Sequence, residues 1–140
     1  MADNTNRVRG LRDVQQALKK LPDKVEQRVL DDAVRAGAQV ILKEAKARVR
    51  VRSGALKRSI ALGALAAGQR RRPGQIFVGV KEPESERAHL LEFGTRYARA
   101  FPFLRPAVDT RRRAFIKKVA DMLGKGVERE ATKLGRGRRR

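Results

Sequence analysis

A single histidine and no cysteine limit the chemistry available to this chain of 140 residues. A nucleophilic relay would have to join His89 to a serine, either Ser53 or Ser59. It would also need Asp109, and no spacing in the sequence places these side chains together. A metal site would need His or Cys ligands that the chain lacks. We therefore expect no catalytic residue, no metal site and no cofactor.

Charge is the most prominent property of the composition. The chain has 35 Lys and Arg against 15 Asp and Glu, a net charge of +20, which implies a polyanionic partner or a strongly acidic neighbour. No acidic residue occurs between Ala45 and Lys81, and self-repulsion in such a basic block opposes folding unless something offsets it. We expect a basic loop and the basic C-terminal end to contact polyanions: Arg70, Arg71, Arg72, Arg136, Arg138, Arg139 and Arg140. Charge kept for solubility is the alternative for both segments.

Recognition of a nucleotide sequence is not indicated. The chain shows no helix-turn-helix spacing, zinc finger or basic zipper. Its aromatic residues are not interleaved with the basic block, as a stacking platform for single strands requires. A nonspecific surface that faces phosphates stays open. No apolar run approaches the roughly 18 residues that span a bilayer, and the polar N-terminus lacks a signal-peptide core, so we expect no membrane contact.

The elements that position these residues can be predicted from periodicity and punctuation. We expect helices over 10–21, 22–49 and 84–93 and from Pro106 onward, and a hairpin of strands at 58–65 and 75–81. The apolar stripe of the second helix is expected to be Val25, Val29, Ala33, Ala36, Val40 and Val49, with Gly37 at a close packing point or a bend. The stripe of the last helix is expected to be Val108, Phe115, Val119 and Met122, with Gly124 and Gly126 weakening its end.

The length of 140 residues predicts a single domain. We place this domain at residues 1–132 and a flexible basic tail at 133–140.

One segment collects most of the aromatic residues of a chain in which only 4% of residues are aromatic. It reads HLLEFGTRYARAFPFLRPAVD and spans residues 89 to 109. Gly94 follows a short apolar helix, where a left-handed cap is expected. Pro102 and Pro106 predict an extended approach into a helix that starts at or just after Pro106.

The aromatic side chains of this segment fall into two groups. We expect Phe103 and Leu104 to fill the small core. Tyr97 and Phe101 belong to the basic stretch RYARAF, and core packing does not account for them.

Three blocks carry a resemblance: Ser53-Gly54-x-Leu56-x-x-Ser59-Ile60, His89-Leu90-Leu91-Glu92-Phe93-Gly94-Thr95 and Pro102-Phe103-Leu104-Arg105-Pro106-Ala107. In order and spacing they resemble the small head–tail joining, or tail-completion, proteins of long-tailed double-stranded DNA phages and of phage-like gene-transfer particles. The resemblance covers about residues 8 to 123. The family more often has Thr before the first Gly, where this chain keeps a hydroxyl as Ser53. The Arg-rich loop and the Arg tail lie outside the family pattern.

The resemblance implies an α+β fold, in which a small antiparallel sheet packs against one long and two or three shorter helices in a single domain. It also implies a virion protein that is assembled in the host cytoplasm. It implies a ring of identical subunits, six by analogy with the family, at the head–tail junction. This ring would contact neck and tail-tube proteins, and DNA would pass through it. The segment from Glu92 to Pro106, named the strap below, would then join subunits. Its expected contact residues are Glu92, Phe93, Gly94, Thr95, Tyr97, Phe101, Pro102, Phe103, Leu104, Arg105 and Pro106. The first block is expected to form a turn motif of Ser53, Gly54 and Leu56.

Two other classes of function remain as alternatives. The first is a nonspecific nucleic-acid-binding protein of the nucleoid type, which the net charge alone favours. The second is a small nuclease or other enzyme, which the lack of recognisable acid–base groups disfavours. An aromatic strap favours contacts with protein, because aromatic rings give large contact area at low entropic cost.

Overall fold

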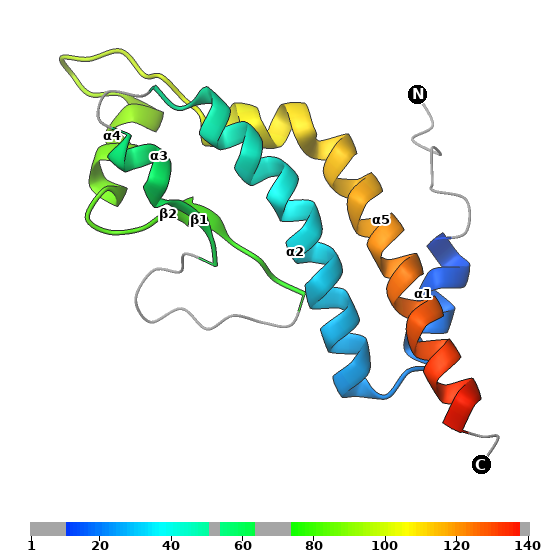
Figure 1. Ribbon diagram of the computed structural model, residues 1–140. Coiled ribbons are helices and arrows are strands. Elements are labelled where there is room, and N and C mark those ends of the chain that lie inside the picture. Colours follow the sequence, from blue (N-terminus) through cyan, green and yellow to red (C-terminus); the bar gives the residue numbers. More distant parts are fainter. Residues whose placement is uncertain (1–10, 51–53, 64–73, 138–140) are drawn as a thin grey trace, which may run out of the picture.

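The computed structural model describes residues 11–50, 54–63 and 74–137. Two long helices lie side by side and antiparallel, and the sheet and two short helices gather at one end of this pair (Figure 1). The helices are α1 (Leu11–Lys19), α2 (Asp23–Arg48), α3 (Ala55–Ser59), α4 (Ser85–Phe93) and α5 (Leu104–Gly137). The strands are β1 (Ile60–Leu62) and β2 (Val78–Val80). The predicted α+β class is confirmed. The structure has two long helices, α2 and α5, where one was predicted.

The two strands pair antiparallel, with Ile60 opposite Val80, as the predicted hairpin requires. The first strand is shorter than expected, because residues 55–59 form α3 instead. Gly54 adopts a positive φ of 74° before this helix, and its carbonyl accepts the N–H of Arg58 at 3.0 Å. Ala, Leu, Lys and Arg are strong helix formers, so this segment follows its local preference once the turn has redirected the chain.

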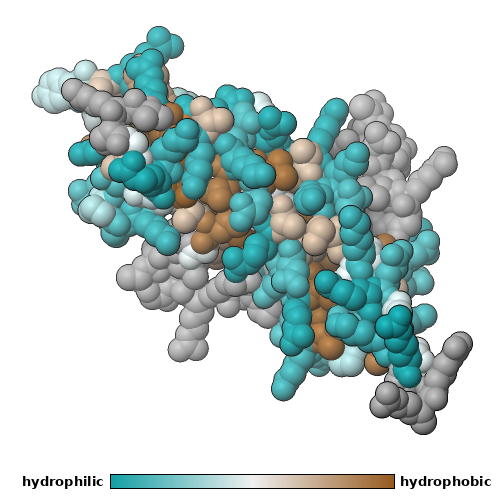
Figure 2. Space-filling view, viewed as in Figure 1, coloured by the Kyte–Doolittle hydropathy of each residue, from teal (hydrophilic) through white to brown (hydrophobic). Residues whose placement is uncertain are grey.

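Two apolar clusters form the core, one at each end of the long helix pair. The cluster at the sheet end contains Leu42, Ala45, Val49, Leu56, Ile60, Ala88, Phe103 and Ala107. The cluster at the α1 end contains Leu18, Leu21, Val29, Ala33 and Leu123. Figure 2 shows hydrophilic side chains over most of one face, with hydrophobic residues gathered in two areas along the pair.

The expected apolar stripes need correction at several positions. In α2, Val25, Ala36 and Val40 are only partly buried, because different neighbours cover α2 along its length and the buried stripe shifts. In α5, Val108 is 44% exposed, and Ala107 beside it is fully buried.

Gly37 marks a close packing point between the long helices, as expected. A Cβ atom at this position would lie 2.5 Å from Val119 Cγ2 and 2.9 Å from Phe115 Cδ2. Gly126 plays the same part further along, because its Cβ would lie 2.6 Å from Val29 Cγ1. The helix backbones therefore approach closely at two points.

The last helix is longer than predicted at both ends. It begins at Leu104 and runs through Gly124 and Gly126 to Gly137, so residues 133–137 of the predicted flexible tail are helical. Packing of Gly126 on Val29 of α2 offsets the weak helix propensity of glycine. Near the end, Lys133 Nζ contacts Glu130 Oε1 at 2.8 Å. Residues 138–140 lie outside the described ranges.

Candidate functional site

Glu92, in the last turn of α4, holds the start of α5. Its side chain is only 5% exposed, and its carboxylate accepts three backbone N–H groups. Oε2 lies 2.8 Å from the nitrogen of Phe103 and 3.1 Å from that of Leu104, and Oε1 lies 3.0 Å from the nitrogen of Arg105. The Glu92 carboxylate therefore joins the first residue of the strap to the backbone near its last residue.

This contact explains why α5 starts earlier than predicted. The first N–H groups of a helix have no partner within the helix, and a negative charge at this end is favourable. Glu92 satisfies the N–H groups of residues 103 to 105, and Pro106 has no N–H to satisfy. The helix can thus begin at Leu104, two residues ahead of the proline that the sequence suggests as its start.

The electrostatics of Glu92 reflect the same geometry. Burial of the carboxyl group opposes its ionisation. The N–H groups of Phe103, Arg105 and Leu104 outweigh this effect, with help from the Arg105 charge, and hold the pKa of Glu92 below its ordinary value. The Arg105 Nε lies 3.5 Å from Glu92 Oε1. Glu92 is therefore a charged group at neutral pH, fixed inside the subunit.

A tight turn follows Glu92 and organises the middle of the strap. Gly94 has a φ of 77° and a ψ of 179°, a positive-φ extended conformation in place of the expected left-handed cap. A Cβ there would lie 2.8 Å from the nitrogen of Ala100. Thr95 Oγ1 accepts the N–H groups of Tyr97 and Ala98 at 3.2 and 2.9 Å. The backbone of the turn is thus held by its own side chains.

The aromatic side chains of the strap divide into buried and exposed groups. Phe103 is 1% exposed and belongs to the core, as expected, whereas Tyr97 is 91% exposed. Phe93 is 58% exposed and Phe101 is 38% exposed. The Phe101 N–H donates to the carbonyl of Leu91 at 2.8 Å, so the backbone that carries this exposed ring is fixed to α4.

Guanidinium groups cover two of these exposed rings. The Arg50 Cζ atom lies 3.7 Å from the ring centre of Phe101, and the Arg105 Cζ atom lies 4.5 Å from that of Phe93. Such cation–π contacts contribute about 0.5–1 kcal/mol each at exposed sites. Because Arg50 follows α2, its contact ties the strap to the long helix pair.

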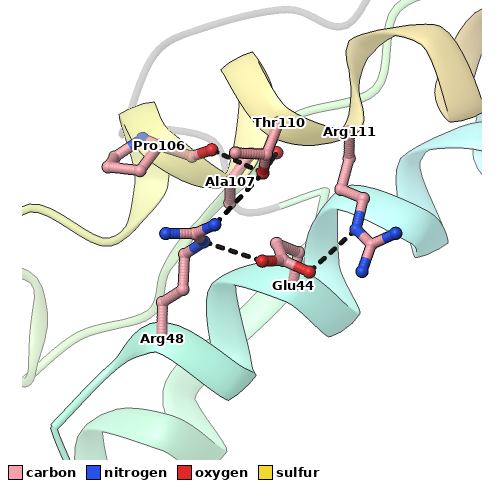
Figure 3. A network of polar contacts seen from close by, with 6 residues as sticks. All are labelled: Glu44, Arg48, Pro106, Ala107, Thr110 and Arg111. Carbon is pink, nitrogen blue, oxygen red and sulfur yellow. Dashed lines mark hydrogen bonds and ion pairs between the residues drawn. The ribbon is translucent and has the colours of Figure 1, made fainter.

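A second polar network holds the first turns of α5 against α2 (Figure 3). Glu44 Oε1 lies 2.7 Å from Arg48 Nε, and Glu44 Oε2 lies 2.8 Å from Arg111 Nε. Thr110 Oγ1 donates to the carbonyl of Pro106 at 2.8 Å and accepts from Arg48 Nη2 at 3.4 Å. The hydrogen bond from Arg111 is the main cause of the lowered pKa of Glu44.

An open groove of about 950 Å³ lies beside the strap. Residues of α3, of α4 and of the strap line it, and Arg50 contributes from beyond the end of α2. Strap residues Thr95 and Phe101 are among its walls, so the groove adjoins the exposed aromatic residues.

The turn motif and the predicted polyanion contacts are only partly described. Gly54 supplies the positive-φ turn and Leu56 is buried in the core, while Ser53 lies outside the described residues. Arg136 is exposed in the last turn of α5. The remaining predicted contacts, Arg70, Arg71, Arg72, Arg138, Arg139 and Arg140, lie outside the described residues.

The residues considered for a nucleophilic relay do not form one in the part of the chain that the structure describes. Ser59 Oγ donates to the carbonyl of Ala55 at 3.0 Å. His89 is exposed, and its ring centre lies 4.7 Å from that of Phe93. Among residues 11–50, 54–63 and 74–137, no group of His, Cys, Asp and Glu side chains could hold a metal ion. No described helix is long and apolar enough to cross a membrane.

Sequence reasoning missed the contacts that join α5 to α2 and the strap to Arg50. The spacing of Glu44 and Arg48 predicts a pair within the helix, because side chains four residues apart are neighbours. Nothing in the sequence indicates that Arg111 joins them from α5, or that Arg50 covers Phe101.

A fixed, exposed aromatic segment on a small α+β protein is typical of proteins that act through contacts with other proteins. A family model described as "Bacteriophage HK97-gp10, putative tail-component" matches residues 12–94. The chain belongs to this family and is a structural tail component of a phage particle, which confirms the family resemblance of the sequence blocks. The match ends at Gly94, so most of the strap and all of α5 lie beyond it. No curated protein and no solved structure matches the chain.

Proposed function

We propose that this tail component forms a ring at the head–tail junction, where it completes the tail and docks it to the DNA-filled head. The resemblance of the sequence blocks suggests six subunits, with neck and tail-tube proteins on either side. The observation that carries the proposal is Tyr97, which is 91% exposed on a turn whose backbone is fixed by Thr95.

Fixation of the strap supports a contact role. Large exposed rings on a soluble subunit contribute to binding when a partner covers them, and a backbone held in place loses little entropy in the process. Glu92 fixes both ends of the strap, and Arg50 fixes Phe101 between them. The strap thus presents Tyr97 and Phe101 in one defined arrangement.

The basic surface supports passage of DNA through the ring. Besides Arg111, which pairs with Glu44, four residues within one stretch of α5 are basic and exposed: Arg112, Arg113, Lys117 and Lys118. A lumen lined by such residues neutralises phosphates without reading bases. The loop of Arg70, Arg71 and Arg72 is proposed as a further phosphate contact.

Removal of the exposed ring tests the assembly role. Tyr97→Ala should leave the free energy of unfolding within about 0.5 kcal/mol of the unchanged protein, because the side chain contacts little within the subunit. It should abolish ring formation, measured as the mass of the purified protein, and leave separate heads and tails in electron micrographs. Ile116→Ala, at a position 48% exposed on α5, is the matched control and should assemble normally.

Phe101→Ala provides a second strap variant. We expect this variant to fold and stay soluble, because Phe101 is 38% exposed and its backbone contact to Leu91 does not need the aromatic side chain. It should nevertheless fail to assemble into the subunit ring. Normal rings and joined particles from both strap variants would remove the strap from the proposal.

A nonspecific nucleic-acid-binding protein of the nucleoid type is the second candidate, favoured by the net charge of +20 and the exposed basic side chains of α5. Phosphate contacts release counterions, so the log–log slope of duplex affinity against salt should be near −0.9 per phosphate neutralised. Changing Arg70, Arg71 and Arg72 to Ser should reduce this slope by up to roughly 3 for any DNA sequence. Tight duplex binding by a protein that neither forms rings nor enters particles would favour this candidate.

A further inference from the structure

Apolar residues line the groove beside the strap and are named its floor below. Leu56 and Leu91 line it from α3 and α4, and Phe101 lines it from the strap. Leu90 also faces the groove and is 52% exposed, although its neighbour Leu91 packs against the core. An apolar floor that water covers in the free subunit gains free energy when another apolar side chain displaces that water.

Basic residues also line the groove and are named its rim below: Arg50, Lys57, Arg87 and Arg99. Among the described lining residues there is no carboxylate. Arg87 forms an ion pair with Glu84 at 3.2 Å. Within the described residues the other three form no ion pair, and the Arg50 guanidinium rests on Phe101. The lining of the groove therefore combines a positively charged rim with an apolar floor.

We infer that this groove binds an acidic, amphipathic segment of another protein of the particle. Carboxylates of such a segment would meet the basic rim, and its apolar side chains would fill the floor. The inference deepens the proposed function and rests on it only in taking the partner from the neck or tail.

Two other occupants match the groove less well. The strap of a second copy would bring Arg96 and Arg99 with Tyr97 to an already basic rim, and each subunit carries +20. A DNA duplex would neutralise the rim, but its phosphates would leave Leu90 and Leu91 without an apolar partner. Only an acidic segment with apolar side chains complements both parts of the groove.

The test measures binding of a short fluorescein-labelled peptide of alternating Glu and Leu to the full-length protein by fluorescence anisotropy. A peptide with Ser in place of Leu probes the floor, and a peptide with Lys in place of Glu probes the rim. We expect the Glu/Leu peptide to bind at least about tenfold more tightly than either control peptide. Equal binding of the Glu/Ser peptide would show that the floor is unused and would overturn the inference.

Variants of the protein locate the binding. Lys57→Glu with Arg99→Glu should weaken Glu/Leu peptide binding about tenfold, because both side chains are exposed at the rim. Arg112→Glu with Lys117→Glu makes the same change in net charge on α5 and should alter affinity by less than about twofold. An equal loss in both pairs would show attraction to net charge alone and would overturn the inference.

A milder variant keeps the test decisive if the charge reversals disturb the fold. Leu90→Ser changes an exposed side chain and should weaken peptide binding about fivefold through the lost apolar contact. Unchanged affinity in this variant would overturn the inference. A short DNA duplex that loses more affinity than the peptide when the rim is reversed would assign the groove to phosphates instead.

Failure of the inference and failure of the proposed ring are separable. No peptide binding, together with unjoined heads and tails in the Tyr97→Ala variant, would remove the groove's assigned partner and leave the ring proposal standing. Peptide binding that depends on the groove, together with normal joining of heads and tails in Tyr97→Ala particles, would support the groove's assigned partner and count against the ring proposal.

Discussion

Replacement of Glu92 probes the contact that closes the strap. Glu92→Ala removes the acceptor of three backbone N–H groups. Glu92→Gln keeps one acceptor oxygen but places its amide NH2 group, itself a donor, toward a backbone N–H. Glu86→Ala is the matched control, because Glu86 is an exposed glutamate in the same helix.

The expected loss follows from the burial of the three donors. The Phe103 N–H is buried, and an unsatisfied buried donor costs about 1–3 kcal/mol. The N–H groups of Leu104 and Arg105 are partly buried, and loss of a helix cap costs about 0.5–2 kcal/mol. We expect Glu92→Ala to lower the free energy of unfolding by about 2–5 kcal/mol. Glu92→Gln should lower it by less, and Glu86→Ala by no more than about 0.5 kcal/mol.

Urea unfolding measured as a function of pH gives a second signature. The pKa of Glu92 in the folded protein lies below its value in the unfolded chain, about 4.3. Its contribution to stability is therefore complete well above that pH and is lost as the pH falls through the lower folded pKa. Glu92→Gln should flatten this acid limb. Glu44 and Glu130 also have lowered pKa values, so part of the limb should persist.

Two results would refute this reasoning. One is a Glu92→Ala protein within about 0.5 kcal/mol of the unchanged protein in urea. The other is an acid limb that Glu92→Gln leaves as steep as before.

Phe103→Ala should unfold or aggregate the protein, because removing a fully buried Phe costs about 3–5 kcal/mol; a cooperative urea transition near that of the unchanged protein would contradict this. Gly37→Leu should lower the melting temperature by separating α2 from α5, at about 1–3 kcal/mol, since even a Cβ there would lie 2.5 Å from Val119 Cγ2; an unchanged melting temperature would argue against the close approach. His89→Ala should leave particle infectivity within a small factor and the fold unchanged, because His89 is exposed beside Phe93; loss of infectivity by an assembled, folded variant would point to a chemical role.

The first long helix, α2, was predictable from the sequence, because apolar periodicity and Pro22 mark it plainly, whereas the length of α5 was not. The buried face of α2 was only partly predictable. Val29 and Ala33 pack at the α1 end as expected, whereas Leu42 and Ala45 pack at the sheet end and were not predicted. One helical stripe cannot anticipate two neighbours that cover different faces of the same helix.

The strap shows the same limit at finer scale. Apolar character was enough to place Phe103 in the core, while Leu104, expected beside it, is only partly buried against that core. The predicted start of α5 at Pro106 was wrong, because the group that caps this helix is the side chain of Glu92, eleven residues upstream of Phe103. Local rules treat a helix end with the residues around it, so a cap supplied by another helix escapes them. The subunit contacts of the strap stay predictions, as does a domain boundary at residue 132.

The α2–α5 pair sets a fixed spacing within the subunit. The 26 residues of α2 span about 39 Å at the usual rise per residue. Close approach at Gly37 and Gly126 keeps the two helices from sliding past one another. The strap lies at one end of this strut and α1 at the other (Figure 1). Two partners bound at these ends would therefore be held apart by a nearly constant distance, because the closely packed helices act as one rigid spacer.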